Sequence, residues 1–347
     1  MRSSLLGFAS GAAVLTTLIA LSGCGGAASG SSTLSVVTST NVYEDIVSQV
    51  AGDFADVSAV IDDPNQDPHS YEATTQDRLK LSKADLVVEN GGGYDSFMTT
   101  MLEASGADVE TIDTVSISGL PGSEGAGNEP HDHGDEEAHG GGHTHEAEAE
   151  GHDHEGHDHE GHDHEGHDHG EFNEHLWYSV PTMTKLVDEV AKHLGEAEPD
   201  HKDDFTANAA EYKKSLDDLQ SRIDEVKKAH GGEKVAATEP VPLWLFDDMG
   251  LKNITSDEFL AAVEEGNDVP PLVLKKAKEQ ISSGEAALLG YNTQAAGPQA
   301  EQLKSTADES DVPVVDLGET MPADAHYADW MGSYITDIST ALEGHEH

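Results

Sequence analysis

Residues 199–230 read PDHKDDFTANAAEYKKSLDDLQSRIDEVKKAH, and this stretch decides the fold. A proline suits the first turn of a helix, and the paired glycines Gly231 and Gly232 suit its end. At about 1.5 Å per residue the helix would be roughly 45 Å long, so we expect it to join two structural units. A coiled-coil arm is the alternative, although the repeat covers only about three heptads. Apolar residues recur in steps of three and four, which places them on one stripe of a helix: Phe205, Ala209, Tyr212, Leu216, Leu219, Ile223 and Val226.

The first 23 residues have the layout of an export signal. Arg2 precedes an apolar run, residues 5–21, that is rich in small residues and short for a membrane span; a transmembrane anchor is the alternative. The run ends in Leu-Ser-Gly-Cys, which resembles the cleavage box of bacterial lipoproteins, in which the cysteine becomes the lipidated first residue. Cys24 is the only cysteine of the chain and cannot form an internal disulfide. Residues 24–32 predict a flexible tether because they are rich in glycine and serine.

The composition restricts the kinds of partner. The chain has 68 acidic and 18 basic residues and a formal net charge of −50. Such a charge argues against binding to nucleic acid or to anionic membrane surfaces, and it favours cations. The roughly 315 residues that follow the tether are enough for two domains with cores of their own.

Residues 33–198 predict an N-terminal α/β lobe. Short β-branched runs alternate with helical stretches up to residue 115, and the runs LSVV and DLVV are apolar throughout, as in a parallel sheet covered on both faces. In such sheets ligands bind in loops beyond the carboxyl ends of the strands. One such loop, DDPNQDPHSYEAT at residues 62–74, carries His69.

Residues 116–172 interrupt this lobe without periodicity and with little apolar content, so we expect a disordered loop. The pentapeptide GHDHE occurs three times from Gly151, and GHDHG follows at Gly166. Because neutral imidazole binds zinc, copper and nickel, this tract predicts weak, unselective binding of several ions. A low-complexity expansion without function is the alternative. The auxiliary histidines are His131, His133, His139, His143, His145, His152, His154, His157, His159, His162, His164, His167 and His169.

The alternation of strands and helices returns after residue 230 and predicts a C-terminal α/β lobe over residues 231–347. Glu239 and Glu319 each come directly after an expected strand, in the place where ligands of parallel sheets bind. The fold class is therefore α/β, with two lobes of mostly parallel sheet flanked by helices and joined by the single long helix at 199–230.

Several motifs resemble those of the metal-binding lipoproteins of bacterial ABC importers for zinc or manganese (cluster A-I, or cluster 9), and the resemblance extends from Cys24 to Leu342. DPHSYE resembles the motif of the first metal ligand, which corresponds to His69. NEHLW resembles the second, which corresponds to His175, and a histidine-rich loop precedes it as in zinc-specific members. Tyr291-Asn292-Thr293-Gln294 resembles a further family stretch, to which we assign no metal role.

The third and fourth ligands are also implied by this resemblance. The third position is usually histidine in zinc branches and glutamate in manganese branches, and Thr238-Glu239-Pro240 supplies a glutamate. The fourth is usually aspartate, whereas Glu319 occupies the matching place here. Two imidazoles and two carboxylates would neutralise a divalent ion and complete a four-coordinate site, or a larger one if a carboxylate binds through both oxygens.

The resemblance implies a fold and a function together. The family fold has two lobes joined by one long rigid helix, with the metal in the cleft between them. We therefore expect an extracytoplasmic, high-affinity zinc-binding protein that delivers the ion to an ABC permease and its ATPase. We expect a monomer that is held at the cell membrane by its N-terminal lipid alone and that binds no nucleic acid.

Other functions remain open at this stage. Oxygen ligands lean toward Mn²⁺, while intrinsic affinity and the histidine tract favour Zn²⁺; we expect Zn²⁺, with Mn²⁺ as the alternative. A surface zinc buffer or adhesin would use the histidine tract itself. A metal-dependent hydrolase would need an open coordination position and a general base. The sequence contains no His-Glu-x-x-His helix, nucleophile motif or phosphate-binding glycine loop, so we expect no enzyme.

Overall fold

The computed structural model describes residues 33–66, 68–69, 71–106, 108–126, 172–294 and 297–345. The predictions of a signal peptide, a tether, the lipidated Cys24 and the auxiliary histidines 131–169 lie outside the described residues. Within the described parts of the chain, no helix combines the length and the apolar character that a membrane span needs.

The N-terminal lobe is built on a four-stranded parallel sheet. Its strands are β1 (Leu34–Thr40), β2 (Ala55–Ile61), β3 (Leu86–Glu89) and β4 (Glu110–Asp113), in the order β2-β1-β3-β4. Val36 in the central strand β1 lies opposite Val57 on one side and Leu86 on the other. The expected alternation of strands and helices is therefore confirmed, and the apolar runs occupy the two central strands.

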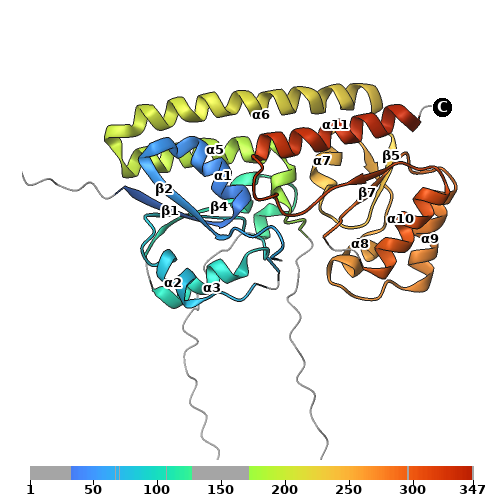
Figure 1. The fold of residues 1–347 in the computed structure, drawn as a ribbon, viewed down its shortest axis with the longest axis horizontal. Coiled ribbons are helices and arrows are strands. Elements are labelled where there is room, and N and C mark those ends of the chain that lie inside the picture. Colours follow the sequence, from blue (N-terminus) through green and yellow to red (C-terminus); the bar gives the residue numbers. More distant parts are fainter. Residues whose placement is uncertain are drawn as a thin grey trace, which may run out of the picture. The chain divides into compact units, whose positions relative to one another are not determined.

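Helices cover both faces of this sheet (Figure 1). They are α1 (Asn41–Ala51), α2 (Thr75–Leu81), α3 (Ser96–Ser105), α4 (Thr114–Ser118) and α5 (Val180–Ala197), with 3₁₀ turns at Gly52–Phe54, Ser123–Gly125 and Leu176–Tyr178. Helices α1 and α5 pack together on one face. Helices α2 and α3 cover the other, where Val37, Val87 and Met98 belong to a separate apolar cluster.

The C-terminal lobe repeats this architecture. Its parallel strands are β5 (Lys234–Ala237), β6 (Lys252–Asn253), β7 (Leu289–Tyr291) and β8 (Val314–Asp316), in the order β6-β5-β7-β8. Its helices are α7 (Leu243–Asp248), α8 (Asp257–Glu264), α9 (Pro271–Ser282), α10 (Pro298–Glu309) and α11 (Tyr327–His345). Strand β6 was not predicted, because two residues are too few to show a periodic pattern.

The long helix α6 (Lys202–His230) follows a 3₁₀ turn at Pro199–His201. All seven residues of the predicted apolar stripe are buried, from Phe205 to Val226. One stripe serves both lobes, because α6 packs against α1 and α5 of the N-terminal lobe and against α7 and α11 of the C-terminal lobe. The prediction of a long helix that joins two α/β lobes is confirmed.

Helix α11 is a second connection between the lobes. It lies beside α6 and also contacts α1 (Figure 1). At its start, Tyr327 donates a hydrogen bond from its hydroxyl to the Trp177 carbonyl at 2.8 Å, and His326 Nδ1 lies 2.7 Å from Asp45 Oδ1. A single apolar core runs from the N-terminal sheet through α5 and α6 into the C-terminal lobe. The two lobes are therefore joined by more than the one helix that we predicted.

The structure differs from the prediction at the start of the histidine-rich tract. Residues 116–126 were expected to lack regular structure, but they contain the end of α4 and a 3₁₀ turn. Ser118 and Ser123 are buried, and Ile117 packs against the main core. The few apolar and small residues of this segment are enough to hold it on the lobe. Residues 127–171 lie outside the described parts.

Candidate metal site

The predicted ligands occupy loops that follow strands or precede helices at the facing ends of the two sheets. His69 lies between β2 and α2, and His175 immediately precedes the 3₁₀ turn that leads into α5. Glu239 follows β5, and Glu319 follows β8. His69, Glu239 and Glu319 therefore obey the rule that parallel sheets bind ligands beyond the carboxyl ends of their strands, whereas His175 comes from a loop that leads into a helix.

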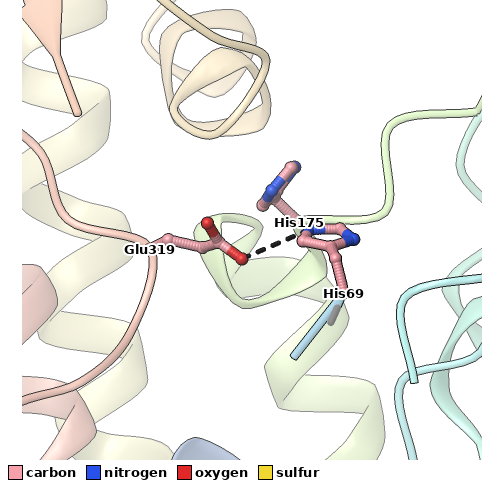
Figure 2. A group of neighbouring side chains, drawn as sticks. All are labelled: His69, His175 and Glu319. Carbon is pink, nitrogen blue, oxygen red and sulfur yellow. Dashed lines mark ion pairs between the residues drawn. The ribbon is translucent and has the colours of Figure 1, made fainter. Parts of the chain in front are cut away.

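Three of these residues form a central triad, His69, His175 and Glu319 (Figure 2). Each offers one possible ligand atom, and these atoms all lie within 4.8 Å of one another. His69 Nε2 is 3.4 Å from Glu319 Oε1, so the triad joins the N-terminal lobe to the C-terminal lobe. His175 is almost completely buried, with 1% of its surface exposed.

Asn173 fixes the orientation of His175. Its Oδ1 lies 2.8 Å from His175 Nδ1, and because an amide oxygen only accepts hydrogen bonds, Nδ1 carries the proton and Nε2 presents its lone pair. Asn173 Nδ2 donates to the Pro240 carbonyl at 3.0 Å, and Trp244 Nε1 donates to the Asn173 carbonyl at 2.9 Å. Asn173 thus ties the His175 loop to the loop that carries Glu239.

Glu174 and Tyr94 surround His69. Glu174 Oε1 is 3.3 Å from His69 Nδ1, on the side of the ring away from Glu319. The Tyr94 ring meets the His69 ring edge to face, with centroids 5.1 Å apart. Burial raises the pKa of Glu174 to about 8, although His69 acts in the opposite direction. This arrangement matches the carboxylate–histidine pairs that orient metal-bound imidazoles.

Glu239 lies in the wall of the same cavity and outside the central triad. Its Oε2 accepts a hydrogen bond from Asn292 Nδ2 at 2.5 Å, whereas its buried Oε1 has no hydrogen-bond donor among the described residues. Burial raises the pKa of Glu239 to about 8, with the charges of Glu319 and Glu264 adding to the shift. A buried acceptor without a donor fits a place for a cation.

Glu319 differs from the neighbouring carboxyl groups in its ionisation. Burial by itself would raise its pKa, but the hydrogen bond with His69 and the charges of His175 and His69 outweigh burial, so the pKa of Glu319 is lowered. One ionised carboxylate therefore stands among acids whose pKa values are raised. A divalent ion could replace the protons on those acids and restore charge balance.

Gln294 shapes the mouth of the cavity, which has a volume of about 380 Å³. Its Oε1 accepts hydrogen bonds from the backbone nitrogens of Glu319 and Thr320 at 2.6 and 2.9 Å. Its Nε2 lies 3.4 Å from the Pro64 carbonyl, to which Thr320 Oγ1 also donates at 2.6 Å. A Cβ at Gly318 would lie 3.2 Å from Gln294 Oε1, so this close approach suits glycine. The motif to which we assigned no metal role therefore holds Glu319 and the His69 loop in place.

Glu174 and Glu264 line the site but were not predicted from the sequence. Glu264, at the end of α8, has its Oε1 4.0 Å from His175 Nε2. Burial raises its pKa to about 7. Glu174 could have been found from its place next to His175 in the quoted motif. Glu264 carries one weak signal, because two acids before a glycine are an unusual end for a helix.

Known proteins match most of this sequence. A family model described as zinc-uptake complex component A, periplasmic (ZnuA), matches residues 36–341. The manganese-binding lipoprotein MntA of Bacillus subtilis is 28% identical over 225 residues, which are 62% of this chain and 56% of MntA. The zinc-binding lipoprotein AdcA of Streptococcus pneumoniae is 27% identical over 225 residues, which are 64% of this chain and 38% of AdcA. The match therefore spans less than two thirds of each relative.

Solved structures share the fold. The structure of the solute-binding protein FpvC of Pseudomonas aeruginosa in complex with Mn²⁺ aligns with a TM-score of 0.64 and 19% identity, covering 90% of this chain and 98% of FpvC. At this identity the likeness concerns the fold alone, and it confirms the expected two-lobed α/β architecture.

Proposed function

This chain belongs to the family of periplasmic zinc-uptake complex components A, and on that premise we propose that it binds a zinc ion outside the cytoplasm and delivers it to an ABC importer. The observation that carries this proposal is the convergence of the central triad from both lobes within 4.8 Å. Two imidazoles and one carboxylate are ligands that zinc favours, and Glu239 in the cavity wall would supply the fourth.

Capture uses groups that are already oriented. Asn173 holds His175 with Nε2 toward the site, and Glu174 contacts the opposite edge of the His69 ring. Because little ordering remains to be done, binding loses little conformational entropy. Glu239 gives up its proton as the ion arrives, since a carboxylate must be ionised to ligate. The cargo then links the two lobes through its own bonds.

Release follows from the way in which the lobes are connected. Wide hinge closure needs a few flexible loop residues, whereas here α6, α11 and a continuous core join the lobes. We propose that contact with the permease moves the loops around His69 and Glu319 and leaves the lobes almost fixed. These loops are held together at the mouth by Gln294 and Thr320, and breaking those hydrogen bonds would separate the ligands.

Zinc is proposed over manganese because the two imidazoles lie in one compact triad and because the chain carries a histidine-rich tract. The surplus of carboxylates around the triad is the observation that favours manganese. The relatives include proteins named for each metal. Elemental analysis of the protein, purified from medium with equal zinc and manganese and dialysed against a weak chelator, decides between them. We expect the dialysed protein to retain zinc. If it retains manganese instead, the choice of zinc is wrong.

Import is tested in cells. A strain that lacks the gene should grow poorly when zinc is scarce, and the wild-type gene should restore growth. The His175→Ala variant should fail to restore it, because the buried imidazole of the triad is gone. His201→Ala is the matched control, since His201 is partly exposed, stacks on the Phe54 ring at the start of α6 and is not among the predicted ligands. Equal growth with both variants would contradict the proposal.

The remaining expectations are part of the same proposal. We propose that the partners are a permease and its ATPase, that the protein acts as a monomer, and that a lipid on Cys24 holds it at the extracytoplasmic face of the membrane. We propose a binding role and no catalysis. A surface buffer or adhesin would depend on residues 127–171 and would not need the triad, so a chain without that segment separates the two functions.

A further inference from the structure

We propose that Glu264 is an additional ligand of the cargo and sets the preference of the site between zinc and manganese. It would supply an extra oxygen to an ion that takes five or six ligands and would matter little to four-coordinate zinc. This inference rests on the proposed function, because it requires the cargo to bind at the central triad.

The distance to His175 supports a direct bond. Glu264 Oε1 lies 4.0 Å from His175 Nε2, the nitrogen that Asn173 leaves with its lone pair. Metal–ligand bonds of about 2.1 Å place two donors to one ion at most about 4.2 Å apart, and neighbouring donors in a tetrahedron roughly 3.4 Å apart. The observed separation of 4.0 Å therefore lies within reach of one ion, and Glu264 would be a fifth donor beside the triad and Glu239.

The position of Glu264 in its helix gives no structural reason for a carboxylate. It is the last residue of α8, and the exposed carbonyls at a helix C-terminus disfavour negative charge. Only 18% of its side chain is exposed, and no lysine or arginine of the described residues forms an ion pair with it. Its ion-pair contact among the described residues is His175 of the triad itself. A largely buried acid without a lysine or arginine partner is costly, so its presence here is best explained by a cation that binds there.

Glu264 faces the site from an element that carries none of the predicted ligands. It lines the 380 Å³ cavity together with His69, Glu239 and Glu319. It also lines a second cavity of about 280 Å³ together with Glu174, so Glu264 borders both cavities. Glu264 therefore shares a cavity with two members of the triad while it comes from an element of its own.

Two isosteric variants test the role of Glu264. Glu264→Gln removes the charge and the second carboxylate oxygen, and Glu265→Gln removes a charge one residue away on an exposed side chain. Zinc and manganese affinities are measured on the full chain by chelator competition, which empties the weaker sites. We expect Glu264→Gln to weaken manganese binding by roughly tenfold or more and zinc binding by less than threefold, with Glu265→Gln near wild type. Equal weakening for both ions would overturn the proposal, because a purely electrostatic effect acts on every divalent ion alike.

A shorter side chain separates charge from contact. Glu264→Asp keeps the charge but withdraws the carboxylate by one methylene, so we expect it to behave like Glu264→Gln toward manganese. Wild-type manganese affinity in Glu264→Asp would overturn the proposal. Visible absorption of the cobalt(II) form is a second readout, because cobalt absorbs weakly with five or six ligands and intensely with four. We expect the band to strengthen in Glu264→Gln, and identical spectra would overturn the proposal.

The two proposals fail in different ways. If His175→Ala keeps tight binding of both ions, the triad is not the site and the proposed function fails. If His175→Ala abolishes binding while Glu264→Gln leaves the ratio of the two affinities unchanged, only the role of Glu264 fails.

Discussion

Replacement of Asn173 by alanine should weaken zinc binding much more than the loss of a remote hydrogen bond would. The change removes the acceptor of two hydrogen bonds from His175, one from Nδ1 at 2.8 Å and one from the backbone nitrogen at 3.2 Å. It also removes the donor to the Pro240 carbonyl at 3.0 Å. The His175 ring is then free to place its proton on Nε2, the atom that we propose as the metal ligand.

The magnitude follows from these contacts. Three hydrogen bonds with a net worth of about 1 kcal/mol each, partly replaced by water, give a loss of roughly 2 kcal/mol in the free energy of unfolding. Loss of a residue that orients a metal-bound histidine typically costs about 10- to 100-fold in affinity. We therefore expect the zinc dissociation constant of Asn173→Ala to rise by about that factor.

Asn173→Asp is the control that separates the two effects. A carboxylate still accepts from His175 Nδ1 and increases its basicity, but it cannot donate to the Pro240 carbonyl. We expect this variant to lose stability and to keep zinc affinity near that of the wild type. Affinity is measured by chelator competition and stability by thermal unfolding of the metal-free protein. If Asn173→Ala unfolds more easily but binds zinc as tightly as wild type, the orientation of His175 is not the reason for its affinity.

Three further predictions concern pH, release and motion. Burial raises the pKa of Glu239 to about 8, so below that pH the ion must displace a proton from this carboxyl group. Zinc affinity should therefore rise as the pH rises from 6 to 8. Calorimetry in buffers of different ionisation enthalpy should show the proton release. A buffer-independent enthalpy at pH 7 would argue against this. Gln294→Glu keeps the acceptor for the Glu319 nitrogen but loses the donor to the Pro64 carbonyl, whereas Gln294→Leu loses both groups. Zinc release, measured by stopped flow, should therefore be faster in both variants than in wild type, and fastest in Gln294→Leu. Equal rates of zinc release in wild type and Gln294→Leu would show that the Gln294 hydrogen bonds do not hold the ligand loops together. X-ray scattering of a chain without residues 127–170 should be nearly the same with and without zinc, because α6 and α11 brace both lobes; a large compaction would refute the proposed release by loops alone.

The sequence predicted elements whose reasons are local. Seven apolar positions at helical spacing predicted α6, and all seven are buried. The run LSVVTST coincides with β1, because an apolar strand in a covered parallel sheet needs no partner information to be recognised. The alternation after residue 230 likewise predicted helices in the C-terminal lobe, and α11 is one of them. That α11 lies along α6 could not be predicted, because an amphipathic pattern does not identify the surface on which it packs.

The site was predictable only where a motif marks the residue. The motifs around His69 and His175 and the strand end before Glu319 led to three residues that the fold brings together. Glu264 could not be selected among 68 acidic residues, because the role that we propose for it depends on the position of α8 relative to a loop from the other lobe. The choice between ligand and wall residue for Glu239 depends in the same way on tertiary geometry.

Calorimetric titration with zinc of the chain without residues 127–170 tests the central claim most directly. We predict one tightly bound ion per chain, since the triad lies outside the deleted segment. This binding should be lost when His69 and His175 are both replaced by alanine. The weaker class of sites should vanish with the deleted histidines. If the tight class disappears with the deletion, or persists in the double variant, the assignment of the metal to the cleft is wrong.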